Sequence, residues 1–124
     1  MASLLYFNTT NEFVKVDLTK VVYMEADGNY CHVFFSNSYE VLVTISLLQM
    51  QGLIAKTLGA DNKAQYIRVG RKYIINTSYL VGVNVARKQV VMTDFSHKPM
   101  TLEVPKEAAR ELKQLLVNNL SLKK

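Results

Sequence analysis

The chain is predicted to fold mainly as β-structure, with a short central helix and a C-terminal helix. Most apolar residues fall in short β-prone runs separated by small polar turns. Only two segments show apolar residues at helical spacing instead. At 124 residues the chain has the length of one domain, which can bury a core without a metal or a disulfide. Its single cysteine, Cys31, excludes an internal disulfide.

The N-terminal third is predicted to form two hairpins and one further strand. Asp27-Gly28-Asn29 lies between two β-prone runs, and Asp-Gly in that position is a good hairpin signal. Polar turns at residues 9–11 and 37–38 separate the other runs. The predicted strands are Leu4–Asn8, Glu12–Val16, Val21–Ala26, Tyr30–Ser36 and Tyr39–Thr44.

A central helix is predicted to begin after Ser46. Ser46 and Gln49 have the spacing of a capping box, in which each side chain accepts a hydrogen bond from the other residue's backbone amide. Gly59 is a natural stop for this helix. The apolar residues at helical spacing are Leu47, Met50, Ile54 and Leu58.

The segment Tyr66–Asn76 sets three cations, Arg68, Arg71 and Lys72, within five residues between two β-prone runs. One regular strand here would bury charge on either face, because side chains alternate between the faces of a sheet. Gly70 interrupts the pattern, and a glycine inside a strand pattern indicates a bulge or a turn. We therefore expect a cationic loop that lifts Arg71 and Lys72 off the sheet. Such a loop suits a polyanion; two solvated surface cations beside a turn are the alternative.

The remaining strands are predicted from alternation and from a second hairpin. Val81, Val83 and Val85 alternate along the first of them, which places them on one face. Arg87-Lys88 closes the hairpin into the next strand. The predicted strands are Tyr79–Val85, Val90–Thr93 and Met100–Val104.

The C-terminal helix is predicted to begin at Pro105, since proline suits the first helical turn. Its apolar stripe is Ala108, Leu112, Leu115 and Leu116, and its basic row is Lys106, Arg110 and Lys113. Two readings of the basic row stay open. It is either a solvated face with glutamates alongside or a surface that contacts phosphates.

Charge is distributed unevenly along the chain, whose net charge is +5. Residues 1–62 hold three lysines and six acidic residues, which gives −3. Residues 63–124 hold twelve Lys or Arg and four acidic residues, which gives +8. This asymmetry predicts one basic face of the kind that binds nucleic acid or an anionic membrane surface.

The chain is expected to be soluble and cytoplasmic. No segment approaches the roughly 18 apolar residues of a membrane span. The N-terminal apolar patch Met1–Phe7 is too short for a signal peptide. A single cysteine fits a reducing compartment, in which Cys31 is a small, partly buried apolar residue rather than a redox sensor.

Several of these segments have the order and spacing of a known family. They are Val22–Tyr30, Leu47-Leu48 at the helix start, Tyr66–Asn76, Tyr79-Leu80 with Val83, and the basic helix after Val104. In these segments the chain resembles the LytTR family of bacterial DNA-binding domains. The resemblance implies a mostly β domain of stacked antiparallel sheets with short helices. It also implies a transcriptional regulator that binds double-stranded DNA through loops in successive major grooves, at paired direct repeats and with some bending.

The resemblance further implies which residues contact DNA. The family's contacts come from three segments. They are the loop after the Asp27-Gly28-Asn29 turn, where Asn29 and His32 lie; the loop inside the segment Arg68–Asn76, which we call the arginine motif; and the segment that enters the last helix, where Lys106 lies. Arg71 lies where a side chain reaching base edges is expected, and an arginine there could bind guanine O6 and N7, worth about 1–3 kcal/mol of discrimination. Lys72 is the expected phosphate contact. The full expected set is Asn29, His32, Arg71, Lys72, Lys106 and Arg110.

The chain departs from the family pattern at three positions. The family usually has histidine in place of Gly70, serine in place of Lys72, and serine or arginine near Pro105. The positive charge is retained, whereas the target sequence does not follow from the resemblance.

The expected organisation is a strand-forming extension over residues 1–13, the LytTR-like domain over residues 14–117, and a tail over residues 118–124, in which Ser121–Lys124 frays. Most such domains follow a phosphoacceptor receiver domain, so the chain is either a stand-alone regulator or an excised domain. We expect a monomer that pairs with a second copy on DNA. Dimerisation through an exposed edge strand is the alternative.

Enzymatic activity is not expected. His32, His97 and Cys31 lack the spacing of a metal site, and Gly70 and Gly82 form no phosphate-binding loop ahead of a helix. No convergent set of catalytic residues is evident, so neither a cofactor nor a small-molecule substrate is expected.

The rival function is a small β-rich protein-interaction module whose basic face binds an acidic protein partner. Specific DNA binding predicts an affinity that falls steeply with salt and a preference for one duplex of roughly three orders of magnitude or more. An interaction module predicts weak, sequence-blind DNA binding.

Overall fold

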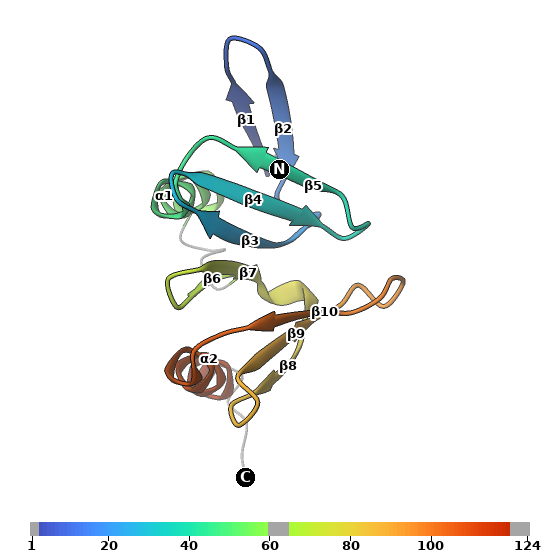
Figure 1. Ribbon diagram of the computed structural model, residues 1–124, viewed down its shortest axis with the longest axis vertical. Coiled ribbons are helices and arrows are strands. Elements are labelled where there is room, and N and C mark those ends of the chain that lie inside the picture. Colours follow the sequence, from blue (N-terminus) through green and yellow to red (C-terminus); the bar gives the residue numbers. More distant parts are fainter. Residues whose placement is uncertain (1–2, 60–64, 120–124) are drawn as a thin grey trace. The chain divides into compact units, whose positions relative to one another are not determined.

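The computed structural model describes residues 3–59 and 65–119. It divides into two compact units, Met1–Ser78 (unit 1) and Tyr79–Lys124 (unit 2). Within the described ranges, ten strands form three antiparallel sheets, and two α-helices accompany them (Figure 1). The prediction of a mainly β chain with antiparallel sheets, a central helix and a C-terminal helix is therefore confirmed. The predicted frayed tail, Ser121–Lys124, lies outside the described residues.

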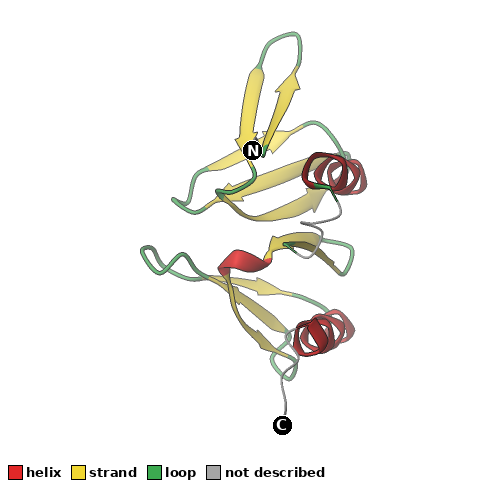
Figure 2. Ribbon diagram, turned by 180° about the vertical axis from the view of Figure 1, so that it is seen from behind, coloured by secondary structure: helices red, strands yellow, loops and turns green. Residues whose placement is uncertain are grey.

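Unit 1 contains a hairpin, a five-stranded sheet and one helix. Its elements are β1 Leu4–Asn8, β2 Phe13–Asp17, β3 Val21–Asp27, β4 Tyr30–Phe35, β5 Glu40–Val43, α1 Leu47–Leu58, β6 Tyr66–Val69 and β7 Tyr73–Asn76. The hairpin pairs β1 with β2, and the sheet has the order β5-β4-β3-β7-β6. Helix α1 lies on one face of this sheet (Figure 2).

The core of unit 1 lies between α1 and the five-stranded sheet. Met50 and Ile54 of α1 belong to one cluster of buried side chains with Met24 of β3, Val33 of β4 and Ile74 of β7. Fully burying each of these large apolar side chains contributes about 1.5–3 kcal/mol relative to leaving it exposed. This packing fixes the sheet that carries the β3–β4 turn and the β6–β7 loop.

Helix α1 begins and ends as the sequence predicts. The amide of Gln49 donates a hydrogen bond to Ser46 Oγ at 3.1 Å, and the amide of Ser46 donates to Gln49 Oε1 at 2.9 Å. Gly59 follows the last turn with φ +76°, where glycine carries no Cβ penalty, and its amide donates to the carbonyl of Ala55 at 2.9 Å. The predicted capping box and stop are both confirmed.

Asn76 is a buried polar residue at the end of β7. Its Nδ2 donates a hydrogen bond to the carbonyl of Val21 at 2.8 Å, and its Oδ1 accepts one from the amide of Ser78 at 3.0 Å. These bonds join the end of β7 to the start of β3 and to the 3-10 helix η2, Thr77–Tyr79. The last residue of the arginine motif therefore has a structural role.

Unit 2 contains a three-stranded sheet and one helix. Its elements are β8 Leu80–Asn84, β9 Gln89–Met92, β10 Met100–Glu103 and α2 Lys106–Asn119. The strand order is β10-β9-β8. Helix α2 contacts β8. Ala108 and Leu112 of its expected apolar stripe are buried, whereas Leu115 is 40% exposed and Ala109, outside the expected stripe, is buried. No helix in the described ranges is long and apolar enough to span a membrane.

Other local expectations also differ from the structure. Tyr79 ends η2 instead of beginning a strand. Pro105 precedes α2, and its carbonyl accepts the hydrogen bond of Ala109 N at 3.0 Å, so the proline is the residue flanking the helix start. A β-bulge between Leu80 and Gly82 interrupts the predicted valine alternation, because the extra residue, Val81, is left unpaired and exposed.

Candidate nucleic-acid interface

Two connections of unit 1 lie at the same end of the five-stranded sheet. They are the β3–β4 turn, residues 28–29, and the β6–β7 loop, residues 70–72, which together we call the loop end. Strands β3 and β7 are antiparallel neighbours, so the end of β3 lies beside the start of β7 (Figure 1). The amide of Ala26 donates a hydrogen bond to the carbonyl of Lys72 at 2.8 Å. The loop end therefore unites two segments that the sequence predicted separately as contact sites.

Arg71 lies in the middle of the β6–β7 loop, which has three residues and confirms the turn expected at Gly70. Gly70 has φ +61°, in the left-handed region that favours glycine. The side chain of Arg71 is exposed and forms no ion pair within the described part of the chain. A guanidinium in this state can approach a polyanion without first losing a carboxylate partner.

The backbone of the β6–β7 loop is held by Arg68. Nη2 of Arg68 donates a hydrogen bond to the carbonyl of Arg71 at 3.1 Å, and its Nη1 donates to Gln51 Oε1 of α1 at 3.0 Å. The loop is thereby tied to the helix that packs on the sheet. Sequence reasoning counted Arg68 among the cations and missed this positioning role, because Gln51 gives no local signal of the contact.

Lys72 has a partner within unit 1. Its Nζ lies 3.3 Å from Glu25 Oε2 and 5.5 Å from the ring centroid of Tyr73. The hydrogen bond to Glu25 is the main cause that raises the pKa of Lys72. The Lys72 side chain is 58% exposed, and exposed ion pairs contribute little to stability. Lys72 could therefore exchange the carboxylate for a phosphate oxygen at small cost.

His32 lies in β4, where both ring nitrogens are engaged. Its Nε2 is 2.8 Å from Asp27 Oδ2 and its Nδ1 is 2.5 Å from Glu40 Oε2. The hydrogen bond to Asp27, followed by that to Glu40, raises the pKa of His32. The arrangement links β3, β4 and β5 across one face of the sheet. His32 therefore has a structural function. A direct contact between His32 and DNA would require its bonds to Asp27 or Glu40 to break.

An acidic hollow of about 300 Å³ surrounds His32 on this face. Its lining is Glu25, Ala26, Asp27, His32, Phe34 and Glu40. Carboxylates repel phosphate oxygens, so the acidic hollow disfavours binding of the DNA backbone. In unit 1, the cationic and exposed part of the predicted site is the loop end, where Asn29 is exposed and follows Gly28 at φ +61°.

Unit 2 carries the other two predicted contacts on α2. Lys106 is the first residue of the helix; it is exposed and forms no ion pair in the described ranges. Arg110 donates from Nη1 to Glu107 Oε1 at 2.7 Å. The basic row predicted for this helix is thus partly neutralised by its own glutamate, and Lys106 is the cation that remains available at the helix start.

The residues weighed as metal ligands do not converge. Cys31 and His32 are successive residues of β4, so their side chains point to opposite faces. Cys31 is fully buried in the core, and burial raises the pKa of its thiol to about 11. Across the described residues, no group of His, Cys, Asp and Glu side chains has the arrangement of a metal site.

Comparisons with known proteins support the fold. The LytTr DNA-binding domain family matches residues 11–117 of the chain. A similar solved structure is the LytTr DNA-binding domain of a Bacillus cereus protein described as a methyl-accepting/DNA response regulator. The two share 21% sequence identity with a TM-score of 0.63, over 94% of this chain and 98% of that one, which supports the fold. No match is found among curated proteins.

Proposed function

Since the chain belongs to the LytTr DNA-binding domain family, we propose that it is a transcriptional regulator that reads a specific sequence in the major groove of double-stranded DNA. The observation that carries this proposal is the exposure of the Arg71 side chain together with the anchoring of its backbone. Its side chain is exposed at the loop end and unpaired in the described ranges, while its backbone is anchored through Arg68 to α1. An anchored backbone beneath an unpaired guanidinium suits base reading, because the backbone is already in place when the contact forms and only the side chain must be ordered.

Each predicted contact has a role in the proposal. Arg71 reads a guanine through two hydrogen bonds to O6 and N7, and Asn29 reaches the DNA from the adjacent turn. Lys72 and Lys106 bind phosphates, which position the protein without selecting a sequence. Arg110 joins them when it leaves Glu107. His32 supports the β3–β4 turn through its bond to Asp27, and this is the means by which it contributes to binding.

We propose that two copies bind direct repeats about one helical turn apart. A single loop end presents one chief base-reading side chain, so a single copy selects only a short sequence. A second copy in the same orientation doubles the sequence read. Titration of duplexes that carry one or two copies of the motif, with the complex mass measured by analytical ultracentrifugation, tests this part separately. Equal affinity and a single bound copy on both duplexes would contradict it.

The test of sequence reading is selection of bound duplexes from a random pool at about 150 mM salt, where binding by counterion release alone is weakened. Wild-type protein should enrich one short motif. Arg71→Ala should lose the preference at one guanine, with a discrimination loss of about 1–3 kcal/mol. If Arg71→Ala enriches the same motif as strongly as wild type, Arg71 does not read bases.

Arg71→Lys is the matched control variant. It keeps the positive charge and removes the planar fork that binds two acceptors at once. We expect Arg71→Lys to retain most of the nonspecific affinity and to lose the preference at the same guanine as Arg71→Ala. This pair of variants separates base reading from a general contribution of charge.

A protein-binding module is the second candidate function, and one observation favours it. Phe95 in the loop between β9 and β10 is 83% exposed, and its backbone has φ +65°. Aromatic residues are enriched in interfaces between proteins, so Phe95 is the residue we propose as a contact with a protein partner. If well-folded wild-type protein enriches no DNA motif, the protein-binding function replaces sequence-specific DNA binding as the proposal.

A further inference from the structure

The β8–β9 turn and the start of α2 are joined in unit 2. The amide of Val104, just before the helix, donates a hydrogen bond to the carbonyl of Lys88 at 3.0 Å. The turn itself is ordered by Asn84, whose Oδ1 accepts from the amide of Arg87 at 2.9 Å. The amide of Lys88 donates to the carbonyl of Val85 at 3.2 Å. Two segments that are separate in sequence therefore hold their cations at one end of the three-stranded sheet.

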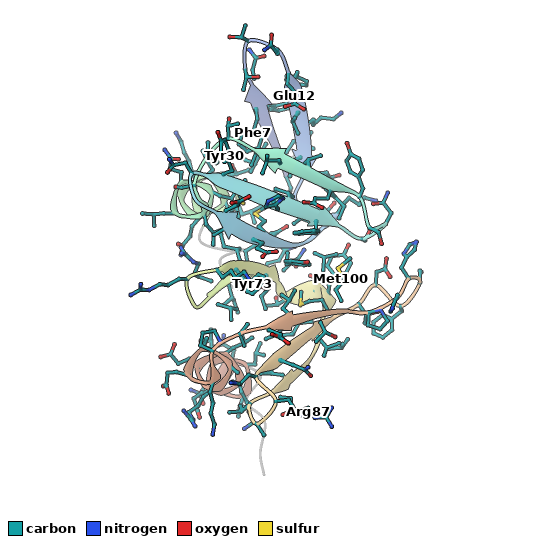
Figure 3. The ribbon with its side chains drawn as sticks, viewed as in Figure 1. Phe7, Glu12, Tyr30, Tyr73, Arg87 and Met100 are labelled. Carbon is teal, nitrogen blue, oxygen red and sulfur yellow. The ribbon has the colours of Figure 1, made fainter. Side chains whose placement is uncertain are left out.

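Three side chains make this end cationic: Arg87, Lys88 and Lys106. All three are exposed, and none forms an ion pair within the described ranges. Figure 3 shows Arg87 extending outward from the β8–β9 turn. Lys88 has φ +58°, so the turn holds it in a conformation that a lysine rarely adopts. We call these three residues the turn cluster.

The acidic residues nearby do not cancel this charge. Glu107 is bonded to Arg110 at 2.7 Å, which leaves it little attraction for Lys106. Glu103 ends β10 opposite Gln89 and forms no ion pair in the described part of the chain. The described ranges therefore give the turn cluster three cations without an ion pair, against one such carboxylate, Glu103. A site of this kind favours a ligand with closely spaced negative charges.

We propose that the turn cluster binds the phosphodiester backbone of duplex DNA. The inference rests on the proposed function, because it assigns a further contact surface to the same ligand. Phosphate contacts supply affinity and orientation and carry no sequence information. The turn cluster therefore strengthens binding to every duplex equally, whereas Arg71 at the loop end selects among duplexes.

The other end of the three-stranded sheet provides a matched control. Lys98 is exposed in the loop that precedes β10, whereas Lys106 follows the end of β10. A strand of four residues separates the two ends by about 14 Å. Lys98 also forms no ion pair within the described ranges. Removing its charge lowers the net charge by the same amount without touching the turn cluster.

The test is the salt dependence of duplex binding by the intact chain. The variants are Arg87→Gln, Lys88→Asn and the two combined; asparagine is chosen because it tolerates a positive φ. Each lost phosphate contact should reduce the slope of log affinity against log salt by about 0.9, and the double variant should bind about tenfold more weakly at low salt. Lys98→Gln should keep the wild-type slope, and Glu103→Gln should bind more tightly.

The outcomes separate this inference from the proposed function. Circular dichroism checks that the double variant is folded. If the folded double variant keeps the wild-type slope, the turn cluster does not bind phosphates, and the proposal of sequence reading is unaffected. Arg87→Gln leaves the positive-φ position Lys88 unchanged and must reduce the slope by itself, so the inference can be tested even if the Lys88 variants do not fold. A changed motif in the double variant would also overturn it, since phosphate contacts are sequence-blind. Wild-type protein that binds no duplex refutes both proposals.

Discussion

Arg68 donates a hydrogen bond from Nη2 to the carbonyl oxygen of Arg71 at 3.1 Å, so one arginine holds the backbone from which the other projects. The same guanidinium donates from Nη1 to Gln51 of α1. Its planar geometry allows both bonds at once, because its N–H groups point in fixed directions. The base-reading role proposed for Arg71 therefore depends on a side chain that need not touch DNA.

Arg68→Lys should weaken sequence discrimination while the protein stays folded. A lysine ammonium cannot reproduce the fork that reaches Gln51 and the Arg71 carbonyl together. Loss of a hydrogen bond to a charged donor should lower the free energy of unfolding by about 1.5–3 kcal/mol. Competition between the selected duplex and a scrambled one measures discrimination, and urea unfolding measures stability. Lys56→Ala, an exposed change on α1, is the control; discrimination equal to wild type in Arg68→Lys would refute the positioning role.

Asn76→Ala should destabilise unit 1 strongly, because the buried amide bonds both Val21 and Ser78. The variant leaves the Val21 carbonyl without its donor, and a buried unpaired polar group costs about 1–3 kcal/mol. Asn29→Ala is the matched change at an exposed position and should alter stability by less than about 0.5 kcal/mol. Chemical unfolding of the two variants tests the contrast. Similar losses in both would contradict the assignment of Asn76 to the core.

Local signals predicted most of the secondary structure. The capping box of Ser46 and Gln49, the turn at Asp27-Gly28-Asn29 and the break at Gly70 each act within a few residues, so they are readable from the sequence. The bulge beside Val81 was missed, because register depends on the partner strand β9. The start of α2 was placed one residue early at Pro105, which is within the usual uncertainty of helix ends.

The candidate site was less predictable, because its contacts join distant residues. Arg68 and Gln51 are 17 positions apart, and Asn76 bonds a carbonyl 55 positions away. The family resemblance predicts a DNA contact for His32, whereas its bonds to Asp27 and Glu40 follow only from the pairing of three strands.

Cys31 should not react with thiol reagents while the protein is folded. The side chain is fully buried, and its pKa is raised to about 11 because burial disfavours the thiolate. At pH 8 the thiolate is therefore both scarce and inaccessible. Ellman's reagent should label the native protein far more slowly than the same protein in urea. Rapid labelling of native protein would show that unit 1 opens around β4.

The pH dependence of stability should reveal the position of His32 between two carboxylates. Bonds to Asp27 and Glu40 raise its folded pKa above the ordinary value of 6.5. A raised histidine pKa stabilises the folded state fully below pH 6.5, and the contribution disappears as pH rises through the folded pKa. Wild-type protein should therefore lose stability above pH 6.5, and His32→Gln should lose less over the same range. Nuclear magnetic resonance titration of the His32 ring measures the pKa directly. A value at or below 6.5 would mean that the two carboxylates do not hold the protonated ring in solution.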